Sequence, residues 1–208
     1  MKVNWRKFAS FFALFFVVLM LSGCSASWLG AVSSLLPALE AAVSAIVSFA
    51  LALEGKTVPA GVAAAIKKIG DDVAVEIQNV QALVAQFKAQ ASAGLLTQIQ
   101  TLLQGVVTNL SSILSGLSIS DASTIGKITN LVGLAVAAAQ AIIALIPVAV
   151  AKMQSGASHA ELQEEDEVAS TALHLTTGNL KSAYHTIVTT PTENADVNAA
   201  LASLPQSI

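Results

Sequence analysis

Apolar residues that recur at alternating steps of three and four positions constrain this chain more than any other feature. Such spacing places the apolar side chains on one face of an α-helix. Three runs of this kind cover most of residues 32–117: Val32, Leu36, Leu39, Val43, Ile46, Ala50 and Leu53; Val62, Ile66, Ile69, Val73, Ile77, Val80, Val84 and Phe87; and Leu96, Ile99, Leu103, Val106, Leu110, Ile113 and Leu117. Because no segment alternates with the period of two typical of strands, the sequence predicts an all-α fold, a bundle of about five helices without a sheet.

The limits of the first three helices follow from proline, charge and turn signals. Pro37 is tolerated in a first turn and disruptive deeper in a helix, so we expect the first helix to begin there. Lysine–aspartate pairs at 67/71 and 68/72 favour one long second helix through Gly70, where it is free to bend. The short turn at 91–94 predicts that the second and third helices form an antiparallel hairpin, with Val80 and Leu110 in the core.

A fourth helix is expected to begin near Ser120 and Asp121, whose side chains accept backbone N–H groups of a first turn. It should end near 152–156 and carry the most apolar stretch after residue 24, Leu131–Ala151. As the central helix of a bundle, this stretch would bury Ala137 and Ile142. It would also require Gln140 to find a hydrogen-bond partner or reach the surface, and Pro147 to kink the helix or mark its last turns.

The C-terminal part predicts two more helices. Ser158 and Glu161 form a capping-box pattern, and the following helix should turn Leu173, Leu180, Tyr184 and Ile187 inward, with an irregularity at 176–179. A second capping box at 190–193, with proline at the first helical position, predicts a short last helix that ends near residue 204.

The N-terminus has the order of a secretory signal. Basic residues at positions 2, 6 and 7 precede an apolar run that is short for a membrane span, which needs about 20 residues. The sequence Leu21-Ser22-Gly23-Cys24 then resembles the lipobox of bacterial lipoproteins. The resemblance covers about the first 25 residues and implies that the chain is cut before Cys24, whose thiol carries the lipid. Cys24 is the only cysteine, so it has no disulfide partner within the chain.

This resemblance implies a signal peptide at 1–23, a lipidated tether at 24–30 and a single helical domain at 31–208. The implied location is the bacterial cell envelope, with a membrane as partner through the lipid on Cys24. In lipoproteins of the enterobacterial type an aspartate after the cysteine favours the inner membrane. Ser25 occupies that position here, which favours the periplasmic face of the outer membrane.

The charge of the processed chain argues against a nucleic-acid partner. Removal of residues 1–23 takes away three of the ten basic residues and none of the thirteen acidic ones, which leaves a formal charge of about −6. Nucleic-acid binding requires clustered lysine and arginine, whereas the densest charge here is acidic, at 161–167.

Residues able to carry catalysis are scarce. His174 and His185 lie about three helical turns apart, too far to share a metal ion, and His159 with Glu161 and Glu164 fits a solvated helix start better than a metal site.

The remaining carboxylates that could act as acid or base are Glu40, Glu76 and Asp121, each alone among apolar residues and expected to be exposed or capping. No Gly-x-Ser-x-Gly or phosphate-binding glycine loop occurs. We therefore expect no enzyme, catalytic residue, cofactor or metal site.

Two functional classes remain. The first is a lipid-tethered helical bundle that serves as a structural or binding module for an unknown protein or lipid partner. The second is a membrane-inserting protein of pore-forming, lysis or exclusion type, in which 131–151 leaves the bundle and enters a bilayer. Alanine and glycine contribute little transfer energy to this segment, which favours the packed bundle.

Overall fold

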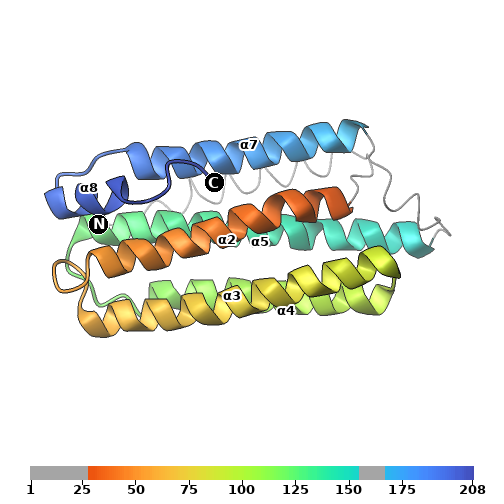
Figure 1. The fold of residues 1–208 in the computed structure, drawn as a ribbon, viewed down its shortest axis with the longest axis horizontal. Coiled ribbons are helices and arrows are strands. Elements are labelled where there is room, and N and C mark those ends of the chain that lie inside the picture. Colours follow the sequence, from red (N-terminus) through yellow and green to blue (C-terminus); the bar gives the residue numbers. More distant parts are fainter. Residues whose placement is uncertain (1–27, 155–166) are drawn as a thin grey trace.

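The computed structural model describes residues 28–154 and 167–208, and within them it contains six helices and no strand (Figure 1). The helices are α2 (Trp28–Ala52), α3 (Ala60–Ala89), α4 (Ala93–Ser115), α5 (Ala122–Gln154), α7 (Glu167–Thr189) and α8 (Ala195–Ala202). The all-α fold expected from the apolar spacing is confirmed.

Helices α2 to α5 form an antiparallel four-helix arrangement in which each packs against the next and α5 returns to pack against α2 (Figure 1). Helix α7 lies along α2 and α5, on the side of the bundle away from α3 and α4, and α8 contacts α7 and α2 at one end. This end holds the α2–α3, α4–α5 and α7–α8 connections, and we call it the loop end. The opposite end holds the start of α2 and the α3–α4 turn, and we call it the α2-start end.

The predicted apolar runs form the core. All seven residues of the first run are buried, as are Val80 and Leu110, which are 0% exposed at the α3–α4 interface. Helix α3 continues unbroken through Gly70, and the two lysine–aspartate pairs close at 2.7 Å each. A Cβ atom on Gly70 would clash with the Val47 side chain of α2. The glycine therefore serves close approach of α3 to α2.

The expected start of the first helix at Pro37 is wrong, because α2 begins at Trp28 and contains the proline. The residues before Pro37 extend the buried stripe, with Leu29 and Val32 both in the core. Pro37 removes the hydrogen bond to the Ser33 carbonyl, but both residues are exposed, so water can bond that carbonyl. Burial of the preceding stripe outweighs the lost bond.

Two expectations for the C-terminal part are also wrong. Helix α7 passes through 176–179 without interruption, because burial of Leu180 and Tyr184 just beyond this segment outweighs the low helix propensity of the exposed Gly178 and Asn179. Helix α8 is capped by Asn194, whose side chain accepts from the backbone N–H groups of Asp196 and Val197. The Thr192 hydroxyl oxygen instead accepts a hydrogen bond from the Asn194 backbone N–H, and the Thr192 backbone N–H donates to the Asn198 side-chain oxygen. The capping box at 190–193 therefore does not form. The box expected at Ser158 and Glu161, and the side chain of Leu173, lie outside the described residues.

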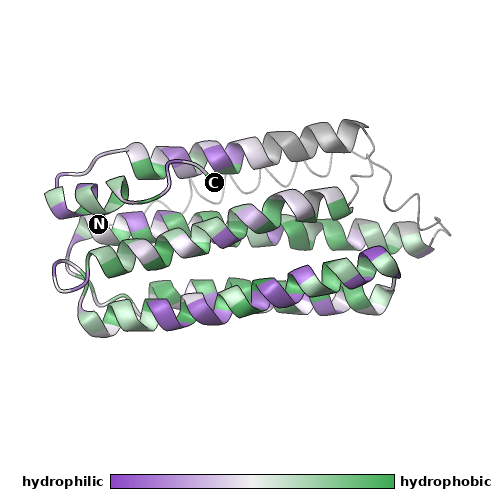
Figure 2. Cartoon of the chain, in the orientation of Figure 1, coloured by the Kyte–Doolittle hydropathy of each residue, from purple (hydrophilic) through white to green (hydrophobic). Residues whose placement is uncertain are grey.

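Helix α5 has the central position expected of it, in contact with α2, α4 and α7. Burial was expected of both Ala137 and Ile142. Ile142 is fully buried, but Ala137 is only half-buried, so the expectation holds for Ile142 alone. Gln140 is also half-buried. Pro147 is exposed inside the helix, seven residues before Gln154. Figure 2 shows hydrophobic residues over much of α2 and α5 and more hydrophilic ones on α3.

We predict that Val80→Ala and Leu110→Ala each lower the free energy of unfolding by about 2 to 4 kcal/mol, because each truncation leaves a cavity between α3 and α4. Chemical denaturation measures this loss. Val75→Ala is the matched control, since Val75 lies on α3 with 56% of its surface exposed and should change stability by less than about 0.5 kcal/mol. Equal midpoints for all three variants would contradict the packing of α3 on α4.

Candidate functional site

The site residue named by the sequence, Cys24, lies outside the described residues, as do His159, Glu161 and Glu164. His174 lies on α7, but its side chain is not described. His185 is exposed on the same helix, with its Nδ1 atom 3.2 Å from the Gln206 carbonyl oxygen. Among the described residues, no three histidine, cysteine, aspartate or glutamate side chains gather closely enough to hold a metal ion.

The three carboxylates singled out from the sequence lie in three different places. Glu40 is exposed on α2, with one oxygen 3.4 Å from the Gln81 amide nitrogen of α3. Asp121 precedes α5 and accepts the Thr124 N–H at 3.1 Å, which confirms its capping role. Glu76 lies between α3 and α4, so these residues do not form a catalytic pair.

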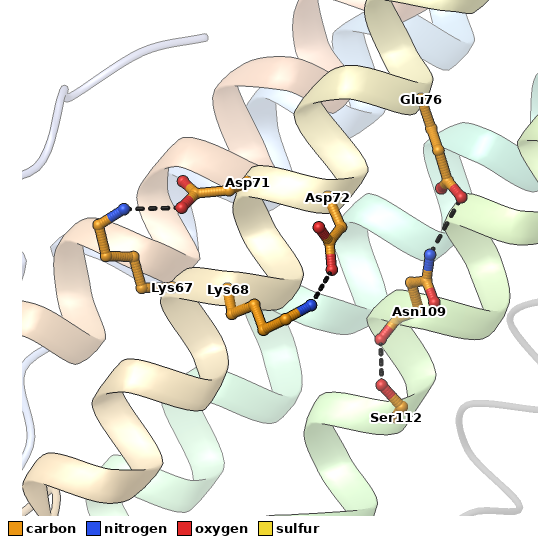
Figure 3. A network of polar contacts seen from close by, with 7 residues as sticks. All are labelled: Lys67, Lys68, Asp71, Asp72, Glu76, Asn109 and Ser112. Atoms are coloured by element: carbon orange, nitrogen blue, oxygen red, sulfur yellow. Dashed lines mark hydrogen bonds and ion pairs between the residues drawn. The ribbon is translucent and has the colours of Figure 1, made fainter.

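Glu76 corrects the expectation of an exposed or capping carboxylate. One of its oxygens accepts from the Asn109 amide of α4 at 3.1 Å, and the other is buried without a hydrogen-bond partner (Figure 3). Gly105 makes room for it, because a Cβ atom there would lie 3.0 Å from the Glu76 carboxylate. Burial raises the pKa of Glu76, the nearby Asp72 raises it further and the Asn109 hydrogen bond opposes both.

The structure gathers a polar cluster at the loop end, which we call the loop-end junction: Thr57, Asp121, Thr124, Lys127 and Asn194. Asp121 accepts from the Asn194 amide at 3.0 Å, which joins the α4–α5 connection to the start of α8. The fully buried Thr124 hydroxyl lies 2.9 Å from that of Thr57, which joins α5 to the α2–α3 connection. Nearby, Lys56 forms an exposed ion pair with Asp196 at 3.0 Å.

Lys127 is the buried cation of the junction. Its Nζ atom donates to the carbonyl oxygens of Ile187 and Thr190, at 2.5 and 2.6 Å. These carbonyls belong to the C-terminal end of α7, where a helix carries partial negative charge. Lys127 therefore caps α7 from α5. Burial lowers the pKa of Lys127, because desolvation disfavours the charged form.

Sequence reasoning missed Lys127, Asn194 and the Glu76–Asn109 contact. Lys127 is the one charged residue between Asp121 and Lys152. A lone charge in so apolar a helix was the one sequence feature that could have indicated a buried, partnered lysine. Its acceptors lie 60 and 63 residues further along the chain, so no local pattern identifies them. Every junction side chain already has a partner within the fold, so the geometry supports joining of helices rather than acid–base chemistry.

We predict that Lys127→Met lowers the free energy of unfolding by about 1 to 3 kcal/mol, because it leaves two carbonyl groups at the end of α7 without their donor. Thermal unfolding followed by circular dichroism measures the change. Lys181→Met, an exposed position on α7, is the control and should unfold like the wild type. A Lys127 variant as stable as this control would show that the cap contributes nothing.

We also predict a pH dependence that Glu76→Gln removes. The pKa of Glu76 is raised above its ordinary value of 4.5, so the folded chain binds the proton more tightly than the unfolded chain. The stabilisation is complete below pH 4.5 and is lost as pH rises through the raised pKa. Denaturation midpoints from pH 4 to 7 should therefore decline more steeply in the wild type than in Glu76→Gln. Parallel profiles would contradict the burial of this carboxylate.

Comparisons with protein-family models, with curated proteins and with solved structures find no significant match to this chain.

Proposed function

We propose that this chain is a lipid-tethered helical bundle of the bacterial cell envelope, held at the periplasmic face of the outer membrane and serving as a structural or binding module. The observation that carries the proposal is the start of α2 at Trp28, four residues after the lipobox cysteine. The lipid and the α2-start end would then be adjacent. Since α2 has 25 residues, the loop end would lie about 37 Å further from the membrane.

Packing of the two most apolar helices supports a bundle that stands beside the membrane. Segments Val32–Ala52 of α2 and Ala122–Ala151 of α5 have the length and composition of membrane spans, features that the core helix of a soluble protein shares. Here the two helices pack against each other. The side chains of Ile46, Phe49 and Ile142 are almost fully buried, so packing within the bundle already shields them from water.

Cys24→Ser should abolish lipid attachment, because serine lacks the thiol that lipobox processing modifies. Metabolic labelling with a fatty-acid analogue, followed by isolation of the chain, measures the attachment. Ser25→Ala is the control and should label like the wild type. Equal labelling of Cys24→Ser would overturn the lipid tether.

The second candidate function is membrane insertion through α5, and one observation favours it. One side of α5 carries the apolar residues Val136, Ile143 and Val150, and each of them is only half-buried. Residues 25–208, produced without signal or lipid, distinguish the two functions. The bundle requires that they stay soluble and do not partition into liposomes. Partition with leakage of the liposome contents would favour insertion.

A further inference from the structure

Helix α7 is held on the bundle of α2 to α5 by a single row of apolar side chains. Between residues 177 and 189, where its side chains are described, the buried ones are Leu180, Tyr184 and Val188, at steps of four residues. Helix α2, by contrast, packs against α3, α5 and α7 and has buried side chains on several sides. Figure 1 shows α7 as an outer layer on α2 and α5. Less buried apolar surface therefore holds α7 than holds α2.

The inward face of α7 also contains a polar group without a partner. The hydroxyl oxygen of Thr177 is buried and has no hydrogen-bond partner among the described residues. Thr177 lies three residues before Leu180 and therefore on the same face of the helix. A hydroxyl group that leaves water without a compensating hydrogen bond opposes burial. When this part of α7 separates from the bundle, water can bond the hydroxyl, which offsets part of the apolar contact that is lost.

Directional bonds join the C-terminal part to the bundle at the loop end. They are the hydrogen bonds of Lys127 to the Ile187 and Thr190 carbonyl oxygens, the bond from Asn194 to Asp121 and the ion pair of Lys56 with Asp196. Between residues 177 and 186, the described side-chain hydrogen bonds stay within the C-terminal part. Tyr184, for example, donates to the Pro205 carbonyl oxygen at 2.9 Å. Among the described residues, polar bonds therefore fix α7 to the bundle at one end only.

We propose that α7 is a lid that pivots at the loop end. Residues 177–184 lift away from α2 and α5, while α2 to α5 keep their fold and the loop-end junction stays closed. Opening uncovers the sides of α2 and α5 beneath α7, and these are the two helices that contain segments with the length and composition of membrane spans. The lid controls whether these sides are covered or accessible without unfolding of the four-helix arrangement. It rests on contacts within the described residues and does not depend on the lipid tether.

Maleimide labelling of buried cysteines in the full-length chain tests the lid. Leu180→Cys lies on the inward face of α7, and Leu103→Cys, on α4 in the bundle core, is the matched control. The two leucines are 8% and 0% exposed, so a bulky reagent reaches either thiol only when the surrounding helices move. Mass spectrometry of the peptide that carries each position measures its labelling rate separately from Cys24. We expect Leu180→Cys to react at least about tenfold faster, because a lid opens more often than the whole bundle unfolds.

A second replacement distinguishes opening of the lid from static access to the thiol. Thr177→Val keeps the shape of the side chain and removes the unpartnered hydroxyl. It should therefore slow labelling of Leu180→Cys by roughly 5- to 100-fold and leave labelling of Leu103→Cys unchanged. Thr189→Val is the control and should change neither rate, since Thr189 is exposed on the same helix with its hydroxyl bonded to the His185 carbonyl oxygen.

Equal labelling rates for Leu180→Cys and Leu103→Cys would show that α7 separates only when the whole bundle unfolds, and would overturn the lid. A Leu180→Cys rate that Thr177→Val leaves unchanged would overturn it as well, because static access does not depend on the buried hydroxyl.

Discussion

The fold depends on the contact between α2 and α5. These are the two most apolar helices, each with the length and composition of a membrane span, and a helix that is apolar over much of its surface has to be covered by several neighbours. Packed together, they form a central pair. Helices α3 and α4 cover one side of this pair and α7 covers another. Close helix approach, as at Gly70 beside Val47, removes water from the seams between the layers.

Polar contacts decide how the ends of this bundle are held. At the loop end, Lys127 caps α7 from within α5, and Asp121 joins two connections through Asn194. These bonds are directional and so select one arrangement of the connections, whereas the apolar stripes alone would tolerate sliding along the helix axes. Glu76 has the opposite energetic effect, since its partly unpaired carboxylate opposes folding at neutral pH.

The structure could be predicted from the sequence where a local pattern and the tertiary packing favour the same conformation. The long α3 and its turn into α4 were predicted, as were the burial of Val80 and Leu110 and the cap at Asp121. Predictions failed where tertiary contacts outweigh local preference. Pro37 lies inside α2 because the stripe before it is buried, and Asn194 rather than Thr190 precedes α8 because Thr192 pairs with Asn198. The Lys127 and Glu76 contacts join distant residues, so no spacing encodes them.

The central claim is that α5 is a core helix of the packed bundle, and the proposed position of the bundle beside a membrane rests on it. Equilibrium unfolding of residues 25–208 carrying Ile142→Asp tests it most directly, with Asn130→Asp as an exposed charge on the same helix. A buried α5 requires that Ile142→Asp abolish cooperative unfolding or lower its midpoint sharply, because the carboxylate has no partner there, while Asn130→Asp unfolds like the wild type. An Ile142→Asp chain that keeps its helical circular dichroism and melting temperature, yet loses leakage of liposomes caused by the wild type, would contradict this claim.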